Sequence, residues 1–165
     1  MAREIERKFL LKNDLWRQQV SKKTLFIQGY LNQIEENSSK SSVRIRIEGE
    51  QANINIKSLE IGLSRDEYEY PIPVDEAQNM LKKLAVGPII EKVRYLVELE
   101  DVTWEIDEFF GDNEGLVIAE VELETEDQTL TLEDWVGREV TDDVKYYNIS
   151  LSKYPFKDWS DDEKN

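Results

Sequence analysis

Residues 42–57 read Ser-Val-Arg-Ile-Arg-Ile-Glu-Gly-Glu-Gln-Ala-Asn-Ile-Asn-Ile-Lys, so that apolar and polar side chains alternate on both sides of a short connection at 49–51. Alternation with a period of two is typical of β-strands with two different faces. A connection this short favours antiparallel neighbours, since two strands joined by a tight turn run in opposite directions. The stretch therefore predicts a β-hairpin with isoleucines on one face and Arg44 and Arg46 on the other.

The same alternation recurs along the rest of the chain. We expect eight strands, over residues 3–11, 25–34, 42–49, 52–59, 65–73, 89–100, 102–109 and 116–126. Because an open sheet leaves unpaired backbone groups at its edges, eight antiparallel strands are expected to close on themselves. The sequence therefore predicts a mostly β (α+β) fold, an eight-stranded antiparallel closed barrel, or tunnel, with peripheral helices.

Four helices are expected between or after these strands. They cover residues 14–20, 75–86, 131–136 and 142–152. The helix at 75–86 has the clearest signals, because its apolar residues recur on one face, Asp75 can cap its first turn and Gly87-Pro88 ends it. No Pro/Gly-rich linker divides the chain, so we expect one domain over residues 1–157, followed by a polar, frayed tail at 158–165.

The composition limits the chemistry that the chain can perform. It contains no cysteine and no histidine, which excludes disulfides, thiolate nucleophiles, the commonest general base and the commonest transition-metal ligand. Any catalysis must therefore use Asp, Glu, Lys, Arg, Tyr or a bound ion.

The net charge limits the partners. The formal net charge is −15, from 36 acidic and 21 basic residues, and long-range repulsion would oppose encounter with nucleic acid or an anionic membrane. The segment 3–8 is charged rather than apolar, and no segment approaches the roughly 20 apolar residues of a membrane span. We therefore expect a cytoplasmic protein with neither nucleic acid nor membrane as a partner. A phosphorylated ligand would need a local positive site.

Charges of one sign occur in pairs on the polar faces of the predicted strands. The pairs are Glu4 and Glu6, Arg44 and Arg46, Lys92 and Arg94, and Glu120 and Glu122. Residues i and i+2 lie about 6.6 Å apart on one face, close enough for two carboxylates to serve one metal cluster or for two cations to serve one phosphate chain. A charged face open to solvent is the simpler interpretation, since antiparallel sheets often have one. If helices cover the apolar faces from outside, the charges instead line the lumen of the barrel.

Such a lumen suits one class of ligand. Crowded carboxylates call for a hard divalent cation with oxygen ligands, whereas arginine and lysine call for phosphate oxygens. A metal-bound oligophosphate satisfies both sets. Phosphoryl transfer needs mainly positioning and charge stabilisation, so a site without His or Cys can catalyse it.

Several short motifs carry a family resemblance over nearly the whole chain. The first is Glu-x-Glu-x-Lys at Glu4, Glu6 and Lys8. The others follow in order: Gln28-Gly29-Tyr30-Leu31, Arg44-Ile45-Arg46, Ile56-Lys57-Ser58, Gly62 to Glu69, Glu91 to Tyr95, Glu105-Ile106-Asp107, Ala119 to Glu122 and Lys145-Tyr146-x-Asn148. Together they resemble the short bacterial branch of the CYTH family, the triphosphate tunnel metalloenzymes. The resemblance implies an eight-stranded tunnel, Mg²⁺ or Mn²⁺ as cofactor and a small triphosphate-bearing substrate.

The resemblance also implies roles for individual residues. The metal-binding carboxylates would be Glu4, Glu6, Glu120 and Glu122, with Glu124 and Asp107 as further candidates. The phosphate-binding cations would be Arg44, Arg46, Lys57, Lys92 and Arg94, with Arg65 and Lys145 as further candidates. Lys8 and Tyr30 would be catalytic, positioning or activating the attacking water. For Arg65 and Lys145 an alternative stays open, because pairing with a glutamate could simply keep the lumen neutral.

Three functional hypotheses follow. The first is metal-dependent hydrolysis of inorganic triphosphate. The second is hydrolysis or cyclisation of an organic triphosphate such as thiamine triphosphate or ATP, since fold alone does not separate these activities. The third is a module that binds polyphosphate or a nucleotide without turnover, although such a module would have little use for the carboxylate pairs. The sequence leaves the preferred metal and the oligomeric state open, a homodimer included.

Overall fold

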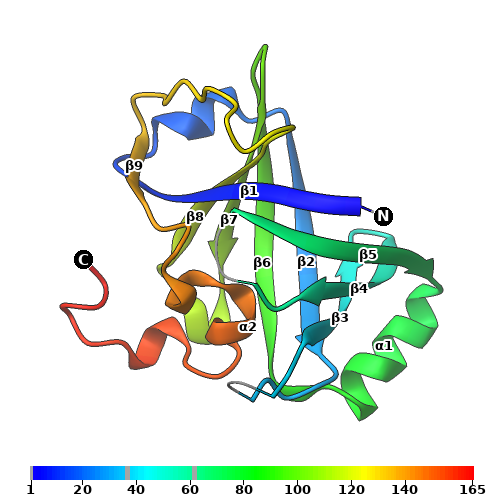
Figure 1. The fold of residues 1–165 in the computed structure, drawn as a ribbon. Coiled ribbons are helices and arrows are strands. Elements are labelled where there is room, and N and C mark those ends of the chain that lie inside the picture. Colours follow the sequence, from blue (N-terminus) through cyan, green and yellow to red (C-terminus); the bar gives the residue numbers. More distant parts are fainter. Residues whose placement is uncertain (1, 36–37, 61–62) are drawn as a thin grey trace.

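Nine strands in the described part of the chain form one antiparallel sheet (Figure 1). The computed structural model describes residues 2–35, 38–60 and 63–165; Gly62, which belongs to one of the motifs above, lies outside them. The strands are β1 (Ala2–Leu11), β2 (Lys22–Tyr30), β3 (Ser41–Glu48), β4 (Gln51–Ser58), β5 (Ser64–Ile72), β6 (Val86–Glu98), β7 (Thr103–Phe109), β8 (Val117–Glu122) and β9 (Val136–Glu139). Their spatial order is β5-β4-β3-β2-β6-β7-β8-β1-β9.

Strand β1 closes this sheet into a barrel. Its residues 2–5 pair with β5, and its residues 6–9 pair with β8. The short strand β9 adds to the same strand further along, where Phe9 and Leu11 are its partners. The predicted eight-stranded antiparallel closed barrel is confirmed, with β9 as an extra strand that the alternation pattern did not indicate.

The apolar faces of the strands point outward and are covered by the connecting segments. The largest cluster contains Trp16 from the helix η1 (Leu15–Gln19), Trp104 from β7 and Trp135 from the segment before β9. A second cluster packs against the C-terminal helices, and a third lies between β3, β4 and α1 (Val74–Lys83). Because the apolar faces are covered from outside, the alternating polar faces turn inward, as the second interpretation of the charge pairs required.

The predicted helix at 75–86 exists with different ends. It begins at Val74 after the N-cap Pro73 and ends at Lys83, so Asp75 lies in the first turn and is not the cap. Gly87 and Pro88 do not end it, because they belong to β6.

The predicted helix at 131–136 is wrong. This segment has no helical residues and leads into β9. The physical reason is tertiary: Trp135 packs edge-on against Trp104 with ring centroids 5.3 Å apart, and its carbonyl accepts from the N–H of Lys12. These contacts hold the segment as an irregular stretch with a turn at Asp134 and Trp135 that leads into β9 beside β1.

The predicted helix at 142–152 is divided in two. The helix η3 (Val144–Tyr146) and the helix α2 (Asn148–Leu151) are separated by Tyr147, whose φ of −74° and ψ of 139° are extended. The tail at 158–165 is polar but not frayed, because Trp159 is buried against Tyr146. Two further short helices, η2 (Gly111–Asn113) and η4 (Phe156–Asp158), complete the fold. No helix in the described ranges is long and apolar enough to cross a membrane.

Candidate functional site

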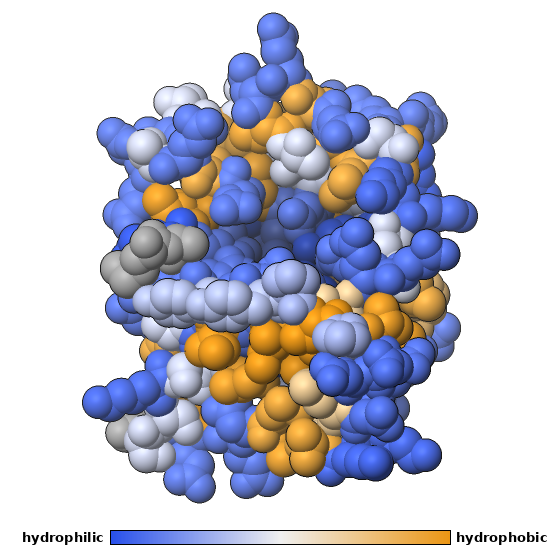
Figure 2. Space-filling view, turned by 90° about the vertical axis from the view of Figure 1, so that its right-hand side faces the viewer, coloured by the Kyte–Doolittle hydropathy of each residue, from blue (hydrophilic) through white to orange (hydrophobic). Residues whose placement is uncertain are grey.

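A cavity of about 990 Å³ occupies the interior of the barrel. All eight barrel strands contribute polar side chains to its lining, and the segment before and within α2 adds Tyr147, Asn148 and Ile149. Figure 2 looks onto the face on which α1 lies and shows a recess bordered by hydrophilic residues between hydrophobic patches. The charged faces of the strands therefore converge on one enclosed volume.

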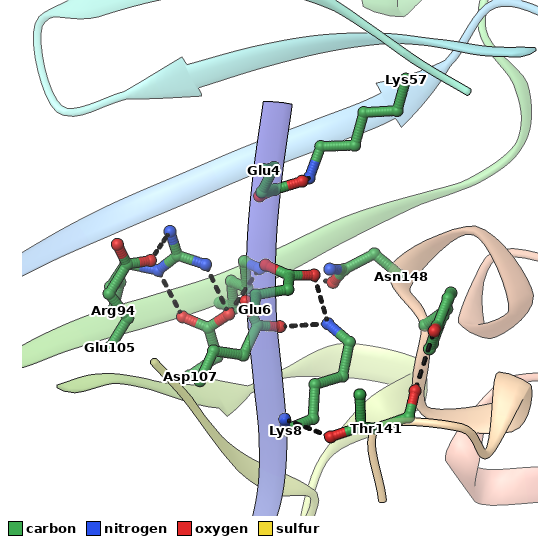
Figure 3. Close-up of polar contacts among 12 residues, drawn as sticks. Glu4, Glu6, Lys8, Lys57, Arg94, Glu105, Asp107, Thr141 and Asn148 are labelled. Atoms are coloured by element: carbon green, nitrogen blue, oxygen red, sulfur yellow. Dashed lines mark hydrogen bonds and ion pairs between the residues drawn. The ribbon is translucent and has the colours of Figure 1, made fainter. Parts of the chain in front are cut away.

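Carboxylates of β1 and β8 lie on one side of this volume among three cations. Glu4 Oε2 lies 2.8 Å from Lys57 Nζ, and Glu6 Oε1 lies 2.5 Å from an Nη atom of Arg65. Lys8 Nζ lies 2.6 Å from Glu120 Oε1 and 3.3 Å from Glu6 Oε1, and Figure 3 shows the Lys8 side chain reaching toward Glu6.

The pKa values of these carboxylates shift in different directions. Burial and the neighbouring Glu6 raise the pKa of Glu4 to about 7, and burial together with Glu105 and Glu67 raises the pKa of Glu122. Although Glu6 is buried too, Lys8, Lys57 and Arg65 hold its pKa well below the usual range. Burial and neighbouring carboxylates thus disfavour the charged form of both acids, and an additional cation would favour it.

The pKa of Lys8 is raised despite its burial, because Glu120 and Glu6 stabilise the ammonium form. Lys8 is 3% exposed and donates a hydrogen bond to Glu120. It is therefore held as a cation at neutral pH, a donor that can orient a ligand or a water molecule but cannot accept a proton.

Arg44 and Arg46 lie on the opposite wall and lack such partners. Both are buried, at 5% and 8% exposure, and neither forms a salt bridge within the described residues. Arg46 donates to Gln28 Oε1 at 3.0 Å and lies 4.7 Å from the ring of Phe26, whereas the Nε of Arg44 has no partner. Burial and the neighbouring Arg44 and Arg94 lower the pKa of Arg46 to about 9. This wall carries positive charge that an anion would neutralise.

A third charged cluster consists of Lys92, Arg94 and Asp107, of which only Arg94 lines the cavity. Asp107 accepts from Lys92 at 2.6 Å and from Arg94 at 2.8 and 2.9 Å, and Lys92 Nζ also lies 3.3 Å from Asn148 Oδ1. Lys92 and Asp107 are buried at 0% and 1% exposure, and neither lines the cavity; Arg94 does and also pairs with Glu105.

The structure brings most of the predicted residues to one place. Those that line the cavity are Glu4, Glu6, Lys8, Tyr30, Arg44, Arg46, Lys57, Arg65, Arg94, Glu120 and Glu122. Four others do not, namely Lys92, Asp107, Glu124 and Lys145. Glu124 is exposed beyond the end of β8, and Lys145 Nζ donates to the carbonyl of Glu163 on the outside of the barrel. Their placement removes Glu124 and Lys145 from the site.

Sequence reasoning assigned no role to several lining residues. Glu105 and Asn55 lie on predicted polar faces, so the alternation could have found them; Asn55 Nδ2 donates to Glu69 at 3.1 Å. Tyr147 lies outside the barrel strands, and no periodic pattern marks it. Within the described residues no three acidic side chains are already gathered as a metal site, since lysines and an arginine lie between them.

The fold and the site together define a class, the closed antiparallel barrels with a densely charged interior cavity. The chain belongs to the CYTH domain family, whose family model matches residues 2–154. It is 44% identical over 161 residues, which are 98% of this chain and 100% of the relative, to an inorganic triphosphatase of Acetivibrio thermocellus. It is 38% identical over 128 residues, 76% of this chain and 82% of the relative, to an inorganic triphosphatase of Nitrosomonas europaea. A crystal structure of an inorganic triphosphatase matches with a TM-score of 0.64 and 32% identity, covering 92% of this chain and 95% of that one.

Proposed function

We propose that the protein hydrolyses inorganic triphosphate inside the barrel with the help of a divalent metal ion. The observation that carries the proposal is the wall of Arg44 and Arg46, two buried cations with no carboxylate partner among the described residues, facing a wall of carboxylates across one cavity. A small polyanion that also carries a metal ion would meet both walls. The relatives named as inorganic triphosphatases support this choice of substrate.

Mg²⁺ or Mn²⁺ is the proposed cofactor, with Glu4, Glu6, Glu120 and Glu122 as the residues that would hold it. The donor set fits, because it consists of carboxylate oxygens, which these ions prefer. The raised pKa values of Glu4 and Glu122 support it further, since burial and neighbouring carboxylates disfavour the charged form of each acid and a bound cation would favour it. When bound, the ion would supply Lewis-acid stabilisation of phosphoryl oxygens.

The residues of the chain would bind the phosphate chain and orient the attacking water. Arg44, Arg46, Lys57 and Arg94 bind the phosphate chain and stabilise charge that develops on its oxygens. Water attacks a phosphorus atom, the P–O–P bond breaks, and pyrophosphate and phosphate leave, with a proton released to solvent. Lys8, held as an ammonium group, orients the water together with Tyr30.

The proposal also covers location. A cytoplasmic protein would act on a small triphosphate-bearing substrate, without nucleic acid or membrane as a partner, and a chain without cysteine is compatible with a reducing compartment. Fractionation of cells that express the protein tests this part.

One assay tests the reaction itself. Phosphate release is measured from triphosphate, pyrophosphate, ATP and thiamine triphosphate, each with Mg²⁺ and with Mn²⁺. We expect triphosphate to be turned over with the highest kcat/KM. Faster turnover of an organic triphosphate would show that this compound, and not inorganic triphosphate, is the substrate. Binding without any phosphate release would show that the protein is a binding module and not an enzyme.

A further inference from the structure

Lys8 lies on β1 at the point where the strand beside β1 changes from β5 to β9. On one side of β1, residues 2–5 pair with β5, and β9 begins to pair only at Phe9. The N–H of Lys8 faces the interval between these two strands. A buried N–H without a partner would be costly, so some other group has to complete the wall at this point.

Thr141 supplies that group. The N–H of Lys8 donates to Thr141 Oγ1 at 3.0 Å (Figure 3). The carbonyl of Lys8 accepts from the N–H of Val140 at 2.8 Å. Both backbone groups of Lys8 are therefore held by two consecutive residues just beyond the end of β9. Thr141 is itself buried, at 5% exposure.

The hydroxyl of Thr141 is oriented for this task. It donates to Glu139 Oε2 at 2.7 Å, and Arg7 holds that carboxylate through two hydrogen bonds of 3.0 and 2.6 Å. A hydroxyl group has one proton and two lone pairs. Because its proton is committed to Glu139, a lone pair remains to accept from Lys8.

Tyr147 connects this arrangement to the cavity. Its hydroxyl donates to the carbonyl of Thr141 at 2.8 Å, and its ring lines the cavity. Lys8 Nζ lies 5.2 Å from the ring centroid, and the guanidinium carbon of Arg65 lies 4.9 Å from it. The aromatic face thus lies beside the Lys8 ammonium group while the hydroxyl holds the residue that fixes the Lys8 backbone.

We propose that Thr141 and Tyr147 are positioning residues that fix the Lys8 ammonium group for the reaction, Thr141 through the Lys8 backbone and Tyr147 through Thr141 and the Lys8 side chain. The inference rests on the proposed function, in which Lys8 orients the attacking water. A displacement of about 1 Å at such a group can cost on the order of a hundredfold in rate. Substrate binding depends mainly on the arginines of the opposite wall and should change little.

The test compares Thr141→Val with Thr141→Ser in the full chain. Valine keeps the shape and removes the hydroxyl, whereas serine keeps the hydroxyl. With triphosphate and Mg²⁺ we expect Thr141→Val to lower kcat at least about tenfold with KM within about threefold of wild type. Thr141→Ser should recover most of the loss. Tyr147→Phe, which keeps the ring, is the second variant and should lower kcat in the same sense.

Asn113→Ala is the matched control. Asn113 is also buried and its side chain accepts one backbone N–H, from Phe156, but it does not line the cavity. It should lower the melting temperature and leave kcat and KM unchanged when rates are corrected for the folded fraction. If Thr141→Val and Tyr147→Phe behave like this control, or if serine fails to restore what valine removes, the positioning role is wrong while the proposed function stands. If wild type releases no phosphate from triphosphate, the positioning role and the proposed function are both wrong.

Discussion

At the scale of single residues, the buried cations differ in how far carboxylates within the fold compensate their charge. Lys92 and Arg94 share Asp107, which compensates them within the fold. Arg44 and Arg46 are buried to a similar degree without a salt bridge in the described ranges. A buried charge without compensation costs free energy of folding, and a site retains it where a ligand of opposite charge makes use of it.

This contrast predicts opposite effects of two substitutions on stability and binding. Arg44→Met keeps the aliphatic stem and removes the charge, so the free energy of unfolding should stay the same or rise by about 1 kcal/mol. KM for triphosphate should rise at least about tenfold, because a charge-assisted phosphate contact is lost. Denaturant unfolding and steady-state kinetics measure the two effects. Arg17→Met, at an exposed pair with Glu108, should leave KM unchanged, and an equal rise in KM for both variants would contradict the assignment of Arg44.

Asp107→Asn, in contrast to Arg44→Met, should lower the free energy of unfolding. It leaves Lys92 with no carboxylate partner among the described residues and Arg94 with Glu105 alone, so the free energy of unfolding should fall by about 3–5 kcal/mol. Because these cations hold the pKa of Asp107 below its usual range, wild type has this stabilisation at any pH above the ordinary aspartate pKa and loses it as pH falls toward the folded value. Burial lowers the pKa of Lys92 to about 7, and Asp107 is the main group that opposes this. Without Asp107, Lys92 should stay unprotonated in the folded variant as pH falls, while wild type binds the proton. The difference between the two proteins, followed by urea unfolding, should therefore grow from pH 7 to pH 5. A difference that vanished by pH 5 would contradict the arrangement.

At the scale of elements, β9 and the residues after it finish the wall that β1 leaves incomplete. Gly137 allows the close approach: a Cβ atom there would lie 2.8 Å from the carbonyl oxygen of Leu10. The neighbour is backbone and cannot turn aside. Any side chain at this position would push β9 away from β1 and, with it, the residues that hold Lys8.

Gly137→Ala should therefore lower both stability and kcat. We expect a loss of about 1–3 kcal/mol in the free energy of unfolding and a fall in kcat beyond what the folded fraction explains. Gly111→Ala is the control, because its φ of +63° makes alanine unfavourable while no atom lies within 4 Å. It should cost stability alone. A loss of kcat in both variants would mean that general destabilisation accounts for the effect.

At the scale of the whole molecule, a strongly acidic chain encloses a cavity with one cationic wall. The net charge of −15 describes the molecule as a whole, whereas the alternation of individual strands places Arg44, Arg46 and Arg94 inside. The barrel and its inward polar faces could be predicted from the sequence because a period of two is a local property of each strand. Closure by β1 followed from the need to pair sheet edges.

The remainder depends on contacts between distant segments, which no local pattern records. Trp135 packs against Trp104 and holds residues 131–136 in an irregular path with a turn. Glu124 falls beyond the end of a strand that is shorter than its alternation indicated. Lys145 matches a family motif but lies in the helix η3 outside the barrel, where its ammonium group packs against Trp159. The proposed roles of Thr141 and Tyr147 depend on hydrogen bonds to β1 and to each other, which no local sequence pattern indicates.

The dependence of phosphate release on free Mg²⁺ tests the central claim most directly, measured with triphosphate for wild type, Glu122→Gln and Glu124→Gln. The two glutamates stand two residues apart, but Glu122 lines the cavity and Glu124 does not. Wild type should be inactive after rigorous chelation and recover with Mg²⁺, and Glu124→Gln should follow the same curve. Glu122→Gln should need at least about tenfold more Mg²⁺ or lose turnover. Undiminished turnover by chelated wild type, or identical curves for the two variants, would contradict metal-dependent hydrolysis inside the barrel.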